Sequence, residues 1–470
     1  MYKKIIITLV VLLPFLGLSQ ENTQSFSLQE AIDFALQNNR TSKNAERDIE
    51  AAKQRKWETT ATGLPQINGK IEYQNWLKQQ VSLLPAAAFD NTQSVIDVVN
   101  DYFDANQTNF DVNSPDGFIP VRFGTKQTMN ASVTVSQLIF DGSYLVGLQS
   151  AKVYLEISEN AKVKTDLEVR KAVINAYGNV LLAEESVQIL QRNKEVLQKN
   201  LNDLTKIYEN GLEEEESVEQ LQITLSSVES SLKNTERLKT LAYQMFNITL
   251  GIDLNNNSVL TDNLETLTQE NISLTLLEAD ANVENTIDYQ IAENDKVSKE
   301  LLLKLEKSKA LPSLSAFVNA GYSGNADNFD FLKKEQQWFG SSLLGVSMNI
   351  PIFSSLGRSA STQRAKINLE KAEDDLLETQ QKLQLQISSA KSNYQFAIED
   401  YDNKKQNLKL AERIEAKNQT KFFEGIASSF DLRQAQTQLY TAQQEFLQAM
   451  LDVITKKAEL ETILNSINKQ

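Results

Sequence analysis

Two stretches of about 70 residues carry apolar side chains at alternating spacings of four and three, the pattern of a coiled-coil seam. The seam of the first stretch is interrupted only at Lys194 and consists of Val169, Val173, Ala176, Val180, Ala183, Val187, Leu190, Leu197, Leu201, Leu204 and Tyr208. The seam of the second consists of Leu369, Ala372, Leu376, Leu383, Ile387, Ala390, Tyr394, Ala397 and Tyr401. At ~1.5 Å per residue, each helix is about 100 Å long, which is far more than a compact globular domain needs. The chain is therefore predicted to build long coiled-coil helices.

Each long helix is followed by a turn and by a return helix with the same apolar spacing, which predicts antiparallel helical hairpins at 143–250 and 357–465. Landmarks around the hairpins occur twice in the same order, as expected for an internal duplication. The paired landmarks are Leu64-Pro65 and Leu311-Pro312, Phe140 and Phe353, and Gly211 and Gly425. We interpret 20–251 and 277–470 as two structural repeats joined by a linker at 252–276.

Four shorter segments alternate apolar and polar side chains, which predicts strands with one apolar and one polar face. These segments are 66–76, 127–140, 312–323 and 341–353. An ordinary antiparallel sheet packed on a core is the alternative interpretation. Since no other segment offers an apolar surface that could cover such a sheet, we expect lipid to contact its apolar face.

Three further segments complete the predicted organisation. Ser27 and Glu30 have the spacing of a capping box, which predicts a helix from Leu28 to about Thr60. Another helix is expected at roughly 277–309, ahead of the third strand, and residues 81–125 are expected to form a long polar and aromatic loop.

The chain of 470 residues contains no cysteine and no histidine. Thiol nucleophiles, histidine bases, His/Cys zinc sites and the Ser-His-Asp triad are therefore excluded, as is a thioether-linked lipid anchor. A pair of carboxylates could still serve a glycosidase, but no pattern frames two acids in a concave fold, so we expect no enzyme, cofactor or metal site. The formal charge of −15, without a basic stripe, argues against a nucleic-acid partner.

Residues 1–19 have the three parts of a secretory signal peptide. Lys3 and Lys4 precede an apolar run at 5–18, and residues 17–19 form a small-x-small cleavage site. The run is shorter than the ~20 residues of a spanning helix, and no later stretch reaches that length with sufficient apolarity. We therefore expect an exported protein that could cross a membrane only through its strands.

Four strands cannot close a barrel in a membrane, and an open sheet edge in lipid is prohibitively costly. Four strands from each of three chains give twelve, within the range of outer-membrane barrels. The predicted fold is mainly α with a β-barrel portion. Long antiparallel coiled-coil helices and four strands per chain would build a trimeric, 12-stranded barrel in the outer membrane and an α-helical tunnel in the periplasm.

Nearly the whole predicted mature chain resembles the TolC-type outer-membrane efflux proteins. The segments that carry the resemblance are Ser27-Leu28-Gln29-Glu30-Ala31-Ile32, both Leu-Pro joints, Ile139-Phe140-Asp141-Gly142, Pro351-Ile352-Phe353, Gly425-Ile426-Ala427-Ser428-Ser429-Phe430-Asp431-Leu432 and Ala435-Gln436. The resemblance implies a homotrimeric duct in outer-membrane lipid. It also implies docking to an inner-membrane RND or ABC pump through a periplasmic adaptor, and export without chemistry.

The resemblance also implies an acidic ring at the periplasmic aperture. Asp431 matches the first acid of that ring, whereas Gln434 stands where the family has a second. The first repeat instead carries Glu213, Glu214, Glu215 and Glu216 directly after Gly211. Three copies of these carboxylates would favour cations, but a Glu run in a first helical turn could equally offset the helix dipole and solvate the surface.

The two hairpin tips have two possible uses. Gly211 and Gly425 are expected to adopt the left-handed conformation that ends many helices. In the family, the same tips meet the adaptor, which implies adaptor contact for Gly211, Gly425, Ile426 and Ser428. A periplasmic coiled-coil protein or surface adhesin is the alternative function, although it has no need for duplicated pairs of amphipathic strands.

Overall fold

A computed structural model describes residues 24–89, 91–103, 116–278 and 282–465, so the predicted signal peptide lies outside the described residues. In chain order the elements are β1 (Gln24–Phe26), α1 (Leu28–Asn38), α2 (Arg40–Ala61), β2 (Gln66–Asn75), β3 (Val81–Pro85), the 3₁₀ turn η1 (Ala86–Phe89), α3 (Thr92–Phe103), β4 (Phe118–Arg122), β5 (Gln127–Phe140), α4 (Gly142–Glu209), α5 (Glu215–Leu250), β6 (Ser258–Leu260), α6 (Leu264–Glu270), α7 (Leu274–Glu278), the 3₁₀ turn η2 (Val283–Asn285), α8 (Ile287–Ser308), β7 (Ser313–Ala326), β8 (Trp338–Asn349), α9 (Gly357–Phe423) and α10 (Ser429–Leu464).

The chain forms two compact units, each assembled from segments distant in sequence. A helical unit takes its described residues from Met1–Lys56, Gln149–Leu303 and Thr362–Gln470, and a strand unit comprises Trp57–Leu148 and Lys304–Ser361. None of the described helices combines the length and the apolarity needed to cross a membrane as a helix.

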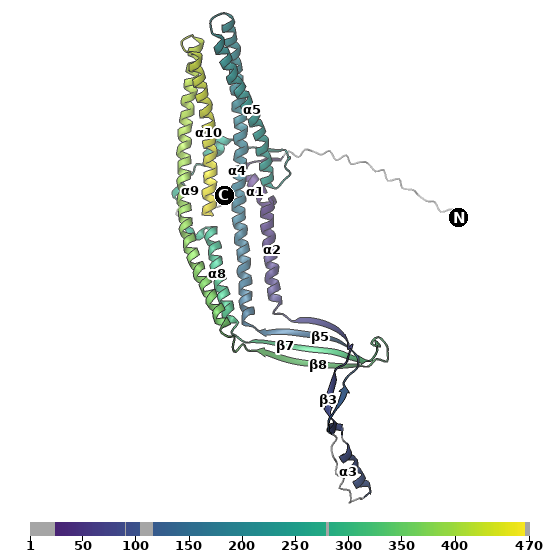
Figure 1. Cartoon of the computed structure of the whole chain (residues 1–470). Coiled ribbons are helices and arrows are strands. Elements are labelled where there is room, and N and C mark those ends of the chain that lie inside the picture. The colour runs from purple at the N-terminus through teal and green to yellow at the C-terminus, as the bar shows by residue number, and fades with distance from the viewer. Residues whose placement is uncertain (1–23, 90, 104–115, 279–281, 466–470) are drawn as a thin grey trace, which may run out of the picture. The chain divides into compact units, whose positions relative to one another are not determined.

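The helical unit is built on two antiparallel helix pairs, α4 with α5 and α9 with α10 (Figure 1). The two long helices have 68 and 67 residues, and both return helices have 36. Most predicted seam residues are buried, including Val173, Leu197 and Tyr394. Lys194, the polar interruption of the first seam, forms an ion pair with Glu229 of α5 at 3.0 Å.

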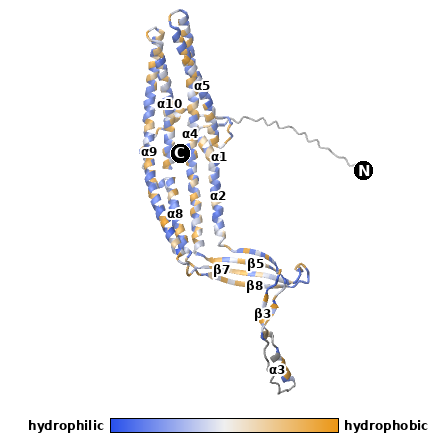
Figure 2. Cartoon of the chain, viewed as in Figure 1, coloured by the Kyte–Doolittle hydropathy of each residue, from blue (hydrophilic) through white to orange (hydrophobic). Residues whose placement is uncertain are grey.

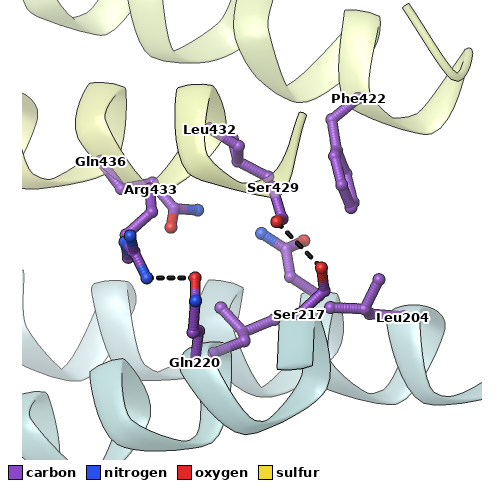
Figure 3. A pocket seen from close by; sticks show the side chains of 10 residues that line it. Leu204, Ser217, Gln220, Phe422, Ser429, Leu432, Arg433 and Gln436 are labelled. Atoms are coloured by element: carbon purple, nitrogen blue, oxygen red, sulfur yellow. Dashed lines mark hydrogen bonds between the residues drawn. The ribbon is translucent and has the colours of Figure 1, made fainter. Parts of the chain in front are cut away.

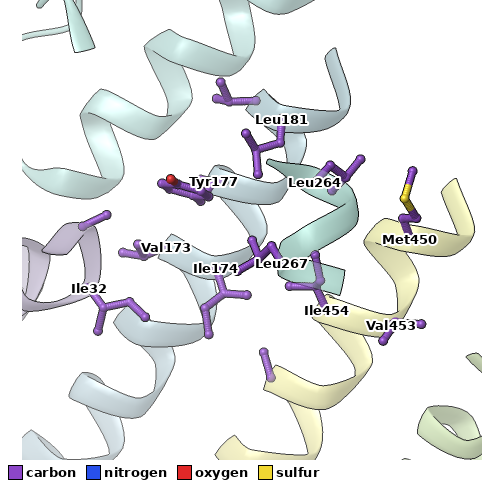
Figure 4. Packing of buried hydrophobic residues seen from close by; sticks show 14 of the residues in the cluster. Ile32, Val173, Ile174, Tyr177, Leu181, Leu264, Leu267, Met450, Val453 and Ile454 are labelled. Carbon is purple, nitrogen blue, oxygen red and sulfur yellow. The ribbon is translucent and has the colours of Figure 1, made fainter. Parts of the chain in front are cut away.

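The main core of this unit joins α1, α4, α5, α6, α9 and α10 (Figure 4). Tyr177 of α4 is fully buried there, and its hydroxyl lies 2.9 Å from Asp262 Oδ2 and 3.0 Å from the Phe26 carbonyl oxygen. Burial raises the pKa of Tyr177, so the hydroxyl stays protonated. A nearly buried ion pair between Arg170 and Glu461, at 2.7 Å, also ties α4 to α10.

Two predicted segments of the helical unit differ in detail from the structure. Ser27 and Glu30 form the predicted capping box, but the helix expected at 28–60 is broken at Asn39 into α1 and α2. The Asn39 side chain accepts a hydrogen bond from the Thr41 amide at 2.7 Å. Asn39 therefore caps the beginning of α2 directly after α1 ends. The second predicted helix begins at Ile287, ten residues later than expected.

The predicted linker at 252–276 is largely structured. Its strand β6 pairs in parallel with β1, and its helix α6 packs Leu264 and Leu267 into the main core. Neither feature was expected, because a strand of three residues and a helix of seven carry almost no periodic signal.

The strand unit contains the predicted four-stranded antiparallel sheet, in the order β2-β5-β7-β8. Residues directly opposite each other on neighbouring strands share a face, and the register places the apolar members of the four alternations together. This apolar face consists of Ile67, Ile71 and Tyr73 of β2, Met129, Ala131, Val133 and Val135 of β5, Leu314, Ala316, Val318, Ala320 and Tyr322 of β7, and Leu344, Val346 and Met348 of β8. Hydrophobic and hydrophilic residues alternate along these strands in Figure 2.

Much of the apolar face is exposed. Ile67, Leu344 and Val346 have exposed fractions of 71%, 73% and 66%. The alternative of a sheet packed on an ordinary core therefore does not hold for the described chain. Among the strands that the structure describes, the two outer ones, β2 and β8, each have a hydrogen-bonded neighbour in the sheet on one side only.

The β7–β8 loop covers the apolar face at one end. Phe331 is buried there, with its ring centroid 6.0 Å from Tyr73 and 6.3 Å from Trp338. Gly324 makes room for it, because a Cβ at that position would meet Phe331 and Trp338 at 3.3 Å. Aromatic side chains therefore gather at this end of the sheet, as in the interfacial girdles of membrane barrels.

Two other parts of the strand unit correct the expectations. The fourth strand was predicted to reach residue 353, but β8 ends at Asn349. Pro351 cannot donate a ladder hydrogen bond, and the Arg358 guanidinium holds the Pro351 carbonyl in a turn at 2.9 Å. The predicted loop at 81–125 contains a two-stranded sheet of β3 and β4 as well as α3.

Candidate functional site

The two helical hairpins turn through the same backbone motif. Gly211 and Gly425 have positive φ angles of 73° and 75°, which confirms the predicted left-handed conformation. The amide of Leu212 donates to the Ile207 carbonyl at 3.1 Å, and Ile426 donates to Lys421 at 2.8 Å. These are Schellman turns, in which glycine avoids the strain that a Cβ would add.

Asp431 lies in the first turn of α10 and is fully exposed. Its Oδ2 accepts hydrogen bonds from the Ser428 hydroxyl at 2.7 Å and the Ser428 amide at 3.0 Å, while the Ser428 hydroxyl accepts one from the Asp431 amide. The pair therefore forms a capping box that begins α10. The hydrogen bonds from Ser428, with a smaller contribution from Lys421, lower the pKa of Asp431.

We expect this cap to be lost in acid. Because the folded pKa of Asp431 lies below its unfolded value of about 4, the stabilisation is fully present above that value and disappears as the pH falls through the folded pKa. Replacing the capping residue, Ser428→Ala, should cost about 1 kcal/mol of local helix stability at neutral pH. Hydrogen exchange in the first turn of α10 measures both effects.

The Asp431→Ala variant is the reference for that experiment. Its first turn should exchange faster than the wild type at pH 7, and the difference should vanish below the folded pKa. Equal exchange at pH 7 would mean that the carboxylate does not stabilise the turn.

The predicted acidic run occupies the turn before α5 and the beginning of that helix. Glu214 is the N-cap residue but makes no side-chain capping hydrogen bond, and Glu215 and Glu216 follow in the first turn. Glu213 accepts a hydrogen bond from the Ser217 hydroxyl at 2.8 Å. Among the described residues, no group of three or more acids is arranged as metal ligands would be.

The structure brings the beginnings of the two return helices together (Figure 3). The hydroxyls of Ser217 and Ser429 are 2.9 Å apart, and Arg433 donates a hydrogen bond to Gln220 Oε1. A small apolar cluster of Leu204, Val218, Phe422 and Leu432 lies beside these contacts. Glu213 therefore lies close to the start of α10, while the Asp431 carboxylate binds Ser428 of its own helix cap.

Sequence reasoning missed four residues that join the hairpins: Ser217, Gln220, Ser429 and Arg433. The available signal was that Ser217 directly precedes the seam residue Val218 and Arg433 directly follows the seam residue Leu432. Heptad spacing identifies which side chains fill one hairpin, but it does not indicate which polar neighbours face a second hairpin.

Comparison with known proteins shows which family the sequence resembles. Residues 302–466 match the model of the outer membrane efflux proteins. The outer membrane protein TolC of Vibrio cholerae is 21% identical over 355 residues, which cover 73% of this chain and 78% of that protein. Residues 302–466 therefore match the outer membrane efflux proteins, and the chain resembles TolC over most of its length.

Solved structures of low sequence identity share the fold of this chain. The crystal structure of CusC has a TM-score of 0.71 and 16% identity, covering 93% of this chain and 92% of CusC. The CmeC outer membrane channel of Campylobacter jejuni has a TM-score of 0.69 and 19% identity, covering 93% of this chain and 85% of CmeC. The predicted fold class of the single chain and its predicted resemblance to this family are therefore confirmed. The match of residues 302–466 indicates an outer membrane efflux protein, which is a transport protein and not an enzyme.

Proposed function

We propose that three copies of this chain close into one 12-stranded barrel in the outer membrane, with the helical hairpins forming a tunnel in the periplasm. The assembly is the passive exit duct of a tripartite efflux or type I secretion system. Small molecules or polypeptides reach it from an inner-membrane RND or ABC pump through a periplasmic adaptor.

The observation that carries the proposal is the four-stranded sheet with one exposed apolar face and two free edges. Lipid is the environment that such a face fits, whereas backbone groups left unpaired at the edges are not tolerated there. Pairing β8 of one copy with β2 of the next satisfies both edges. Since the four strands alternate in direction, this new pair is antiparallel like the others.

Charge at the hairpin tips supports a cation-favouring aperture. Glu214, Glu215, Glu216 and Asp431 are exposed, and Glu213 is partly exposed. Threefold symmetry multiplies these five carboxylates around one opening, and a ring of acids raises the local concentration of cations. The alternative role, helix capping without an effect on ions, predicts no change in selectivity when the acids are removed.

The hairpin tips are the proposed contact with the adaptor. Leu212 and Ile426 follow Gly211 and Gly425 at equivalent positions, and their side chains have exposed fractions of 78% and 70%. Exposed apolar side chains on two matching turns suit a protein partner better than water. Ser428 lies beside Ile426 at the second tip.

Planar-bilayer recording tests the duct and its aperture together. The purified protein should form pores. Replacing Glu213, Glu214, Glu215 and Glu216 with Gln, together with Asp431→Asn, should lower the cation-to-anion permeability ratio several-fold.

A matched control removes the same number of acids from the first third of α9. Its substitutions are Glu370→Gln, Glu373→Gln, Asp374→Asn, Asp375→Asn and Glu378→Gln. This variant should keep more of the wild-type selectivity than the tip variant. Failure to form pores would contradict the duct, and equal selectivity of both variants would contradict the acidic aperture.

A further inference from the structure

Two buried amide side chains between the hairpins lack hydrogen-bond partners for several of their atoms. Asn200 of α4 is 3% exposed and Gln436 of α10 is 1% exposed. Asn200 Oδ1 accepts a hydrogen bond from Gln419 at 3.2 Å, but Asn200 Nδ2 and both polar atoms of Gln436 have no partner. Buried polar atoms without partners are rare, and most are satisfied by an ordered water molecule.

A small cavity adjoins these atoms. Its volume is about 20 Å³, and its lining includes Asn200, Gln436, Ser217 and Arg433. One water molecule needs ~10–15 Å³ on this scale, so the cavity has room for one such molecule. Figure 3 shows Gln436 beside the Arg433–Gln220 hydrogen bond, at the side of the cavity away from Phe422.

The unpaired atoms define which kind of molecule could bind in the cavity. Gln436 presents both a donor and an acceptor, and Asn200 presents a further donor, so the guest must both accept and donate hydrogen bonds. A halide ion could accept from the two amide groups but would leave Gln436 Oε1 unsatisfied. Burial raises the pKa of Glu415, and the neighbouring Gln436 amide offsets part of that shift, although no hydrogen bond of ordinary geometry joins the two side chains.

We propose that one water molecule occupies this cavity and bridges Asn200 Nδ2 to Gln436. The site lies between two apolar clusters, one of Leu204, Val218, Phe422 and Leu432 and the other of Leu197, Leu225 and Val228. A polar layer within an apolar seam favours one register of the helices over its neighbours, because any slip buries the amides against hydrocarbon. The bound water thus aligns α4 with α10 just behind the tips. This role does not depend on the proposed duct.

A double-mutant cycle on the full-length protein tests the site. Asn200→Leu and Gln436→Leu should each lower the midpoint of thermal unfolding by at least about 2 °C, because each leaves the other amide and the water short of a partner. The double variant replaces the polar layer with apolar groups and should recover to the wild-type midpoint or above it. Gln222→Leu is the matched control, since Gln222 holds the equivalent position in α5 and is exposed.

A crystal structure that resolves ordered water gives a direct readout. Density for one water within hydrogen-bond distance of both amides supports the proposal. An empty cavity overturns it, and so does a double variant whose loss equals the sum of the two single losses.

Discussion

Cysteines placed on the two free edge strands should join three copies of the chain into one covalently linked ring. The wild-type chain has no cysteine, so every disulfide comes from the introduced residues. Asn68→Cys on β2 is combined in turn with Leu343→Cys, Ser347→Cys or Asn349→Cys on β8, all on the face opposite the apolar one. Directly opposed residues of antiparallel strands lie within the Cα separation of ~4.4–6.8 Å that a disulfide needs.

At least one of these pairs should give dimer and trimer bands on a non-reducing denaturing gel, and the best pair reveals the register between copies. A cysteine pair at Thr134 and Asn319 is the control, because these residues oppose each other within one chain. It should oxidise without changing the band from monomer. If no β2–β8 combination cross-links in membranes while the control pair oxidises, the closure of the barrel by three copies is wrong.

A lysine on the apolar face of the sheet should prevent stable insertion, whereas a lysine one residue further along should be tolerated. Val346 points to the apolar face and Ser347 to the opposite one. The cost of Val346→Lys is about 2–4 kcal/mol per chain if the residue lies near the middle of the bilayer, and three chains share the barrel. Ser347→Lys adds the same charge to the polar face, where water can solvate it.

Refolding into lipid vesicles, followed by urea titration, measures this difference. The Val346→Lys variant should unfold at a clearly lower urea concentration than the wild type, and Ser347→Lys should remain close to the wild type. Equal sensitivity of the two variants would mean that the apolar face does not contact lipid.

Periodicity was enough to predict the long helices and the four-stranded sheet, because both depend on patterns repeated over many residues. In a strand, side chains alternate between two faces, so all apolar members of one alternation lie on the same face. Val133 and Val346 could therefore both be assigned to the apolar face of the sheet before the register was known. The glycines of the hairpin turns were equally accessible, since a left-handed helix end has a strong residue preference.

Features set by contacts between distant segments could not be predicted. Gln436 of the second hairpin belongs to no apolar seam, yet it is buried where the two hairpins meet. The end of β8 depends on the Arg358 side chain, which reaches back seven residues to a carbonyl group. The same limit applies to the run of Glu residues at the first hairpin tip. A single chain does not define which residues would line the opening of the proposed trimer.

The unpaired edges of the sheet have a consequence for how the cell must make this protein. A lone subunit with two free edges can pair with any exposed strand, including those of misfolded neighbours, before it finds two copies of itself. If three copies are needed, assembly depends steeply on subunit concentration. Too little synthesis then leaves barrels unassembled, and too much favours aggregation of unpaired subunits. We therefore expect synthesis to be matched to the supply of periplasmic chaperones that shield strand edges until insertion.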